Sequence, residues 1–158
     1  MLNLINRLVF AIALFGIALP AWSDGVHMSV SRKQSSFAEV KEAIEMAITG
    51  RGLVINNVSH IGNMLARTGN DLGGTKQVYL QAEALEFCSA TVSRNMMVAD
   101  PDNIVFCPYI IAIYVVPENP SEVRVAFRKT QLVGSPESQK ALAAVNELLS
   151  GIIAEALE

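Results

Sequence analysis

The chain has 158 residues, a formal net charge of -3 at pH 7 and 51% hydrophobic residues. This length is typical of one domain, and the apolar fraction is large enough to build a core. The acidic balance argues against binding to nucleic acid or to an anionic membrane surface, because both need a basic patch.

Residues 1–23 have the pattern of a secretory signal peptide. Arg7 supplies a positive charge, residues 8–19 form an unbroken apolar run, and Ala21 and Ser23 are the small residues that a signal peptidase recognises. The run is too short for a spanning helix, which needs about 20 residues. We predict cleavage after Ser23, no stable membrane insertion afterwards, and a domain of residues 24–158 in the periplasm or secreted.

Cys88 and Cys107 are the two cysteines of the chain. An even number of cysteines in an oxidising compartment favours a disulfide, and we predict that these two form one. They can meet if the strands that carry them are antiparallel or if Cys107 lies at a bend. The alternative is a functional thiol, since Cys88 lies near a predicted helix start, where the pKa of a thiol is lowered.

The first half of the domain shows three clear local patterns. Alternating apolar and polar residues predict a strand over 26–32. Ser36 and Glu39 form a capping box that opens a helix ending near Gly50 and Gly52. The next segments are predicted as a strand over 53–58, a helix with Ser59 as its N-cap that runs to Arg67, and a glycine-rich loop over 68–75.

The second half reads as strands, a hairpin and a long final helix. We predict a strand over 76–87, a helix over 89–99, and strands over 104–116 and 123–128 joined by a turn that contains Pro117 and Pro120. Ser135 and Pro136 start the last helix, as N-cap and first helical residue. The side chains expected in the core are Ile44, Ile48, Ile111, Ile113, Val125, Val145, Leu149 and Ile152.

Mixed strands and helices, with two consecutive strands near the end, favour an α+β fold. We expect a single small domain in which helices pack on a mixed or mainly antiparallel sheet.

Several short motifs resemble a small bacterial family, domain-of-unknown-function family 302. They are Phe87-Cys88-Ser89 at a strand end, Met96-Met97 and Asp100-Pro101 in and after a helix, Pro108-Tyr109 opening a strand to Tyr114, and the lead-in of Gly50-Arg51-Gly52 and His60. The resemblance would cover most of the domain. It implies a small α+β domain that is often exported, and it transfers no catalytic residues.

His60 and Met64 are four residues apart on a predicted helix, so they share a face. Imidazole and thioether ligands suit copper or an iron centre, including haem iron, and Met96-Met97 together with Cys88 and Cys107 could complete such a site. The simpler interpretation is that Met64 fills the core and His60 is a polar surface residue. We favour the simpler interpretation and predict no cofactor.

No catalytic motif is present: the chain has two histidines, no Gly-x-Ser-x-Gly sequence and no phosphate loop. Glu83 and Glu86 are expected to be solvated at a strand end. The leading hypothesis is therefore an exported binding or accessory protein without enzymatic activity, for a small ligand or a protein partner that the sequence does not identify. The alternative is a thiol-redox or metal-binding protein that uses Cys88, Cys107, His60 and Met64, and a hydrolase is the least favoured class.

Overall fold

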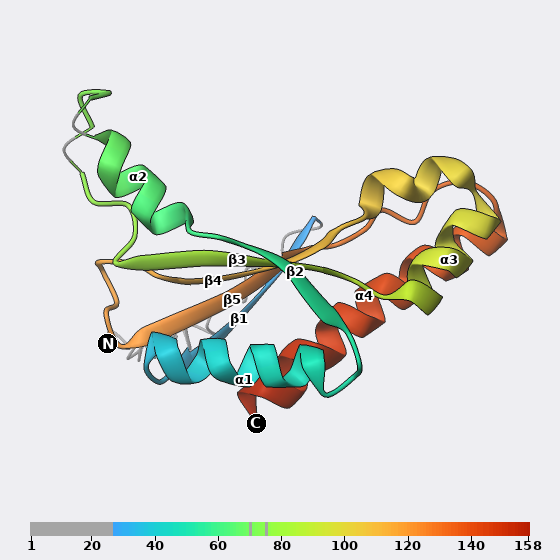
Figure 1. Cartoon of the computed structure of the whole chain (residues 1–158), viewed down its shortest axis with the longest axis horizontal. Helices are drawn as coiled ribbons and strands as arrows, with labels where there is room; N and C mark the ends of the chain where they lie inside the picture. Colours follow the sequence, from blue (N-terminus) through green and yellow to red (C-terminus); the bar gives the residue numbers. More distant parts are fainter. Residues whose placement is uncertain (1–26, 70, 75) are drawn as a thin grey trace, which may run out of the picture.

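A five-stranded antiparallel sheet forms the centre of the molecule, in the strand order β1-β5-β4-β3-β2 (Figure 1). The structure is a computed structural model, and it describes residues 27–69, 71–74 and 76–158. The predicted signal peptide, and Val26 of the first predicted strand, lie outside these residues. The strands are β1 (Met28–Gln34), β2 (Val54–Ser59), β3 (Gln81–Cys88), β4 (Tyr109–Val115) and β5 (Glu122–Arg128).

Within the described ranges, the sheet is accompanied by four α-helices and one 3-10 helix. They are α1 (Phe37–Thr49), α2 (Ile61–Gly69), α3 (Ala90–Ala99), η1 (Pro101–Phe106) and α4 (Pro136–Leu157). In Figure 1, α1 and α4 lie together on one side of the sheet, whereas α2 and η1 stand at its opposite ends. This arrangement confirms the expected α+β fold, and the sheet is antiparallel throughout.

The starts of α1 and α4, for which the sequence has clear capping motifs, have the predicted capping geometry. The Ser36 side chain accepts from the Glu39 backbone N–H, and the Glu39 carboxylate accepts from the Ser36 backbone N–H, which completes the capping box of α1. Ser135 caps α4 by accepting from the Ser138 N–H, with Pro136 as its first helical residue. Gly52, just after α1, has a φ of 71°, a conformation that glycine adopts at little cost.

The predicted strand over 76–87 was placed too early, since β3 begins only at Gln81. Its partner β4 ends at Val115, opposite Gln81, and Pro117 follows soon after. The Leu80 backbone N–H still donates to the Val115 carbonyl. Residues before Leu80 therefore have no neighbouring strand with which to extend the ladder.

The predicted strand over 104–116 was also too long, because Ile104 lies in η1 and β4 begins at Tyr109. The buried Asn103 side chain fixes this turn by donating to the Met96 carbonyl and to the Ser138 hydroxyl. The apolar residues Ile104 and Val105 consequently face outward, with exposed fractions of 60% and 77%. Their hydrophobicity alone had suggested a buried strand.

Ser59 does not cap α2, contrary to expectation. It is the last residue of β2, and its hydroxyl donates to the Glu86 carboxylate. The helix starts at Ile61, one residue after His60.

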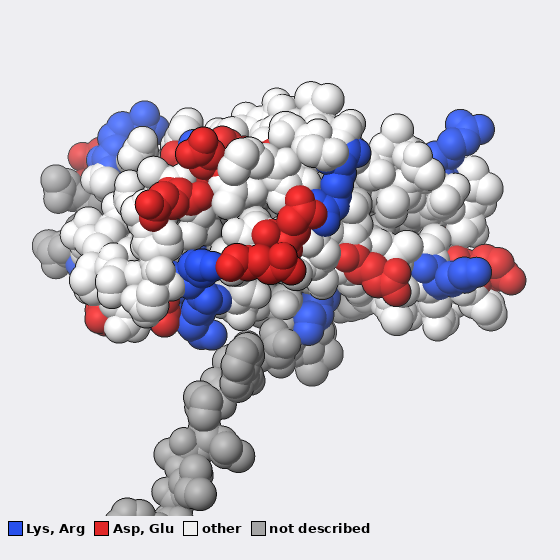
Figure 2. Space-filling model, turned by 90° about the horizontal axis from the view of Figure 1, so that it is seen from below, with Lys and Arg blue, Asp and Glu red and all other residues white. Residues whose placement is uncertain are grey.

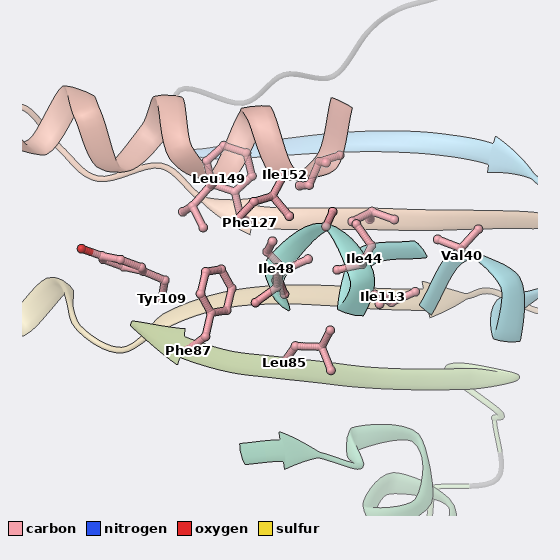
Figure 3. Packing of buried hydrophobic residues seen from close by; sticks show 14 of the residues in the cluster. Val40, Ile44, Ile48, Leu85, Phe87, Tyr109, Ile113, Phe127, Leu149 and Ile152 are labelled. Carbon is pink, nitrogen blue, oxygen red and sulfur yellow. The ribbon is translucent and has the colours of Figure 1, made fainter. Parts of the chain in front are cut away.

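The apolar core lies between the sheet and the pair α1 and α4. Figure 3 shows side chains from both helices meeting those of β3, β4 and β5. Every residue that the sequence assigned to the core is buried there. In β4 the buried positions alternate, with Ile111 and Ile113 facing the core. In β3, Leu85 and Phe87 face the core, and Ala82 and Ala84 are buried on the opposite face.

The opposite face of the sheet has a different composition, and we call it the open face. Cross-strand pairing aligns Ala84, Ala112, Ala126 and Val30 in one row across it. Among the described elements, α2 packs on this face only at the start of β3, where Gly62 lies against the backbone of Ala82. Small residues therefore line the middle of the open face without a helix over them.

Candidate functional site

The open face carries a cavity of about 740 Å³, which we call the trough. Its floor is formed by Ala112 and Ala126, between the larger side chains of Ile110, Tyr114 and Arg128. One end is closed by Ile61 of α2 and by Tyr79, and the other by Val105, Phe106 and Cys107, in and just after η1. This volume is in the range of small-molecule binding sites, which are concave and mostly apolar.

The α2 end of the trough is aromatic. The rings of Tyr79 and Tyr114 meet edge to face, with centroids 5.5 Å apart and an interplanar angle of 69°. The segment before β3 therefore does not extend the strand; it places Tyr79 over the open face, against Tyr114. Aromatic pairs of this geometry contribute about 0.5–1.5 kcal/mol beyond the burial of their surface.

At the η1 end, the trough also reaches side chains that belong to the core side. These include Tyr109, Thr130, and Val145 and Leu149 of α4. The Tyr109 hydroxyl lies 2.9 Å from the Ser93 hydroxyl. Burial raises the pKa of Tyr109, and the hydrogen bond with Ser93 opposes that rise without cancelling it. Tyr109 is therefore a neutral hydrogen-bonding group at physiological pH.

A charged cluster of Lys41, His60 and Glu83 lies at the α2 end, on the core side of the sheet. The Lys41 Nζ is 2.6 Å from one oxygen of Glu83, and the His60 Nδ1 is 3.1 Å from the other. Burial of Glu83 raises the pKa of its carboxyl, but the contacts with Lys41 and His60 together outweigh burial, so the pKa lies below its ordinary value. The same contact raises the pKa of Lys41.

Glu83 and Glu86 are thus not the freely solvated carboxylates that the sequence suggested. Glu86, on the open face, accepts hydrogen bonds from Asn57 at 3.2 Å and from Ser59 at 3.0 Å. Glu83 borders the trough at its α2 end, but its side chain lies on the core side, where Lys41 and contact with His60 balance its charge.

The structure does not bring the four proposed metal ligands together. His60 contacts Glu83, whereas Cys88 lies further along β3, about 17 Å away at the usual rise per residue of a strand. Met64 does not fill the core as expected, because 44% of its surface is exposed on α2. Across the ranges that the structure describes, no group of three or more His, Cys, Asp or Glu side chains is placed to hold a metal ion.

Cys88 and Cys107 do approach each other. Their Sγ atoms are at disulfide distance and their Cα atoms are 6.7 Å apart, a separation that a disulfide can span. The antiparallel pairing of β3 with β4 places the end of one strand beside the start of the other, which is the arrangement that the prediction required. That the pair is oxidised in the mature protein stays a prediction.

Sequence reasoning missed the residues that form the trough. The signal was present in part, since Ala112, Tyr114 and Ala126 alternate with buried residues along β4 and β5. Such alternation indicates that every second residue faces away from the core, but it does not show whether that second face is covered.

The described residues form a small α+β domain with an antiparallel sheet, helices α1 and α4 on one face and the trough on the other. The model of the family described as "Domain of unknown function DUF302" matches residues 28–156. The chain therefore belongs to this family, which confirms the resemblance found in the sequence.

A solved structure shows the same fold. It is the crystal structure of an uncharacterized conserved DUF302 protein from Bacillus stearothermophilus, with a TM-score of 0.69 and 15% sequence identity, covering 84% of this chain and 99% of that chain. At this identity the similarity extends to the fold alone. No curated protein matches the chain.

In the described part of the chain, no helix has both the length and the apolar composition needed to cross a bilayer. The helix side of the molecule, seen in Figure 2, carries acidic and basic side chains interspersed with uncharged ones. The visible face therefore has no extended region of one charge.

Proposed function

We propose that this protein is an exported binding module that holds a small, largely apolar ligand in the trough. The observation that carries the proposal is the cavity of about 740 Å³ on the open face, with an alanine floor and walls that include Tyr79, Tyr114 and Phe106. The proposal includes no catalytic step.

The architecture supports binding in two ways. The floor belongs to the central strands β4 and β5, which are paired on both sides and backed by the core, so the site is largely formed before a ligand arrives. The floor residues are small and the side chains around them are large, so this pattern of residue sizes gives the trough its depth. A flat apolar face would offer a ligand far less contact.

A neutral fluorescent probe, N-phenyl-1-naphthylamine, tests the proposal directly. Its emission rises in apolar surroundings, and we expect saturable binding to protein purified from the exported fraction of an expressing host. Ala112→Leu and Ala126→Leu place extra methyl groups on the floor of the trough, and each variant should weaken binding at least several-fold.

Ala154→Leu is the matched control, since Ala154 is exposed on α4 and does not line the trough. It should bind the probe as the parent chain does. Absence of saturable binding to the parent chain, or equal binding by the floor variants and the control, would contradict the proposed function. Native mass spectrometry of the same preparation then identifies any ligand carried from the host.

Export is part of the proposal and rests on the sequence of residues 1–23. An intact mass that begins at Asp24 is expected. A mass that retains Trp22 would contradict the cleavage position, and protein that resists carbonate washing of membranes would contradict cleavage itself.

The alternative hypothesis of a thiol-redox or metal-binding protein has a separate test. Thiol titration with and without reductant reports the state of Cys88 and Cys107, and elemental analysis reports copper or iron. A freely exchanging thiol pair or a stoichiometric metal would favour that alternative over a purely structural role for these cysteines.

A further inference from the structure

The trough is asymmetric along its length, and its charged lining residues are at different ends. Arg128 and Lys129 follow one another where β5 ends, at the η1 end, and His27 lies beside them because the Lys129 backbone N–H donates to its carbonyl at 3.0 Å. The acidic lining residue, Glu83, lies at the α2 end and contacts Lys41.

Arg128 is the cation best placed to receive a ligand. It is exposed, it is paired across the sheet with Met28, and in the part of the chain that the structure describes it makes no ion pair or side-chain hydrogen bond. The other arginines of the open face differ from it. Arg32 and Arg124 both contact Glu122, at 3.6 Å and 2.9 Å, and neither lines the trough.

The distance from the aromatic end to Arg128 suits an elongated ligand. Tyr114 pairs with Arg124, which lies four residues before Arg128 on β5, so the two ends are about 13 Å apart at the usual strand rise. Between them the floor is Ala112 and Ala126, which offer apolar contact and no polar side chain.

From these observations we infer that the ligand is an anionic amphiphile. Its carboxylate or phosphate head lies against Arg128, and its alkyl or ring portion lies on the alanine floor toward Tyr79 and Tyr114. The inference rests on the proposed function, because it assigns a chemical class to the ligand of the same trough. The guanidinium group supplies the charge-assisted hydrogen bonds that such a head requires.

The test compares three probes that share one alkyl chain and differ in the head: decanoate, decanol and decyltrimethylammonium. The two ionic probes are used below their micelle concentrations, and decanol below its solubility limit. Isothermal titration calorimetry should rank decanoate first, then decanol, then the cation. Arg128→Gln should weaken decanoate binding about tenfold, to the level of decanol, and leave decanol binding unchanged. Arg94→Gln, at an exposed α3 position that does not line the trough, should change neither.

The outcomes separate the inference from the proposed function. Equal binding of the three probes, or an unchanged decanoate affinity in Arg128→Gln, overturns the anionic head while the trough remains a binding site. No binding of any probe overturns both. Sedimentation with anionic phospholipid vesicles distinguishes a free amphiphile from a bilayer: we expect no co-sedimentation, and vesicle binding without decanoate binding would contradict the inference.

Discussion

The two faces of the sheet differ in how deeply their side chains are buried, even for residues that are adjacent in one strand. Ile110 and Ile111 are adjacent in β4 and have the same side chain, but Ile111 is fully buried and Ile110 is 39% exposed. On the core face, large aliphatic residues of the strands fill the space against α1 and α4. On the open face, the middle of the central strands holds Ala112 and Ala126, and the space above these two residues is the trough.

This difference shows how a small domain can combine stability with a binding surface. The core face buries most of the large side chains and supplies the hydrophobic stabilisation of the fold. On the open face, Ile110, Ala112 and Ala126 are at least partly exposed, so substitutions at these positions should affect the stability of the fold less. The two faces should therefore respond differently to the same kind of substitution.

The largest effect is expected from truncating the core-facing isoleucine of β4. Ile111→Ala should lower the free energy of unfolding by about 2–5 kcal/mol, because it removes buried methyl groups and leaves a cavity. Ile110→Ala is the matched control and should cost less than about 1 kcal/mol. Urea unfolding of both variants measures the difference, and similar losses would mean that the two faces are equally packed.

The next effect concerns the predicted disulfide between Cys88 and Cys107, at the η1 end of the sheet. Cys88 and Cys107 are 19 residues apart in sequence, and a disulfide closing a loop of this size stabilises a protein by about 3 kcal/mol. Cys88→Ser should therefore lower stability by up to about that amount while largely preserving binding in the trough. Reductant should destabilise the parent chain by the same amount and leave the variant unchanged. A folded variant that no longer binds would give the cysteines a functional role.

Replacing an alanine by leucine should give a smaller difference in the free energy of unfolding between the two faces. Ala47 is buried in α1, and Ala47→Leu should cost about 1–3 kcal/mol because the core has no room for the added methyl groups. Ala126→Leu, on the open face, should change the free energy of unfolding by no more than about 0.5 kcal/mol. Thermal unfolding checks both, and a large loss in Ala126→Leu would show that the floor is packed against something.

The smallest effect is the pH dependence contributed by the charged cluster. Because the pKa of Glu83 is lowered from its ordinary 4.5, this carboxylate stabilises the fold above about pH 4.5, and the contribution is lost as the pH falls through the lowered value. Glu83→Gln should cost about 1 kcal/mol at neutral pH, since the pair is partly exposed, and progressively less in acid. The exposed Glu42→Gln is the control; a pH-independent loss in Glu83→Gln would exclude an electrostatic origin.

Much of the fold could be predicted from local sequence. The capping box of Ser36 and Glu39 and the Ser135-Pro136 start of α4 are signals that operate within one helical turn, so they do not depend on the rest of the chain. Periodicity identified the buried sides of the helices and strands for the same reason. The β4–β5 hairpin followed from its turn residues, and the order of the motifs was sufficient to indicate the family.

Tertiary structure alone decided the start of β3, the formation of η1 and the position of Glu83. A strand extends only while a neighbour is present, and β4 ends opposite Gln81. The turn of η1 depends on Asn103 meeting Ser138, which is distant in sequence. Glu83 meets Lys41 of α1 for the same kind of reason. These contacts join distant parts of the chain, so no local window contains them.

The trough is another feature that only the tertiary structure decided. The sequence determined that Ala112 and Ala126 face away from the core, because side chains alternate along a strand. Whether a helix would cover them depended on where the helices pack, and in the described structure α1 and α4 both lie on the other face. A cavity is the space that packing leaves unfilled, so only the assembled fold could show it.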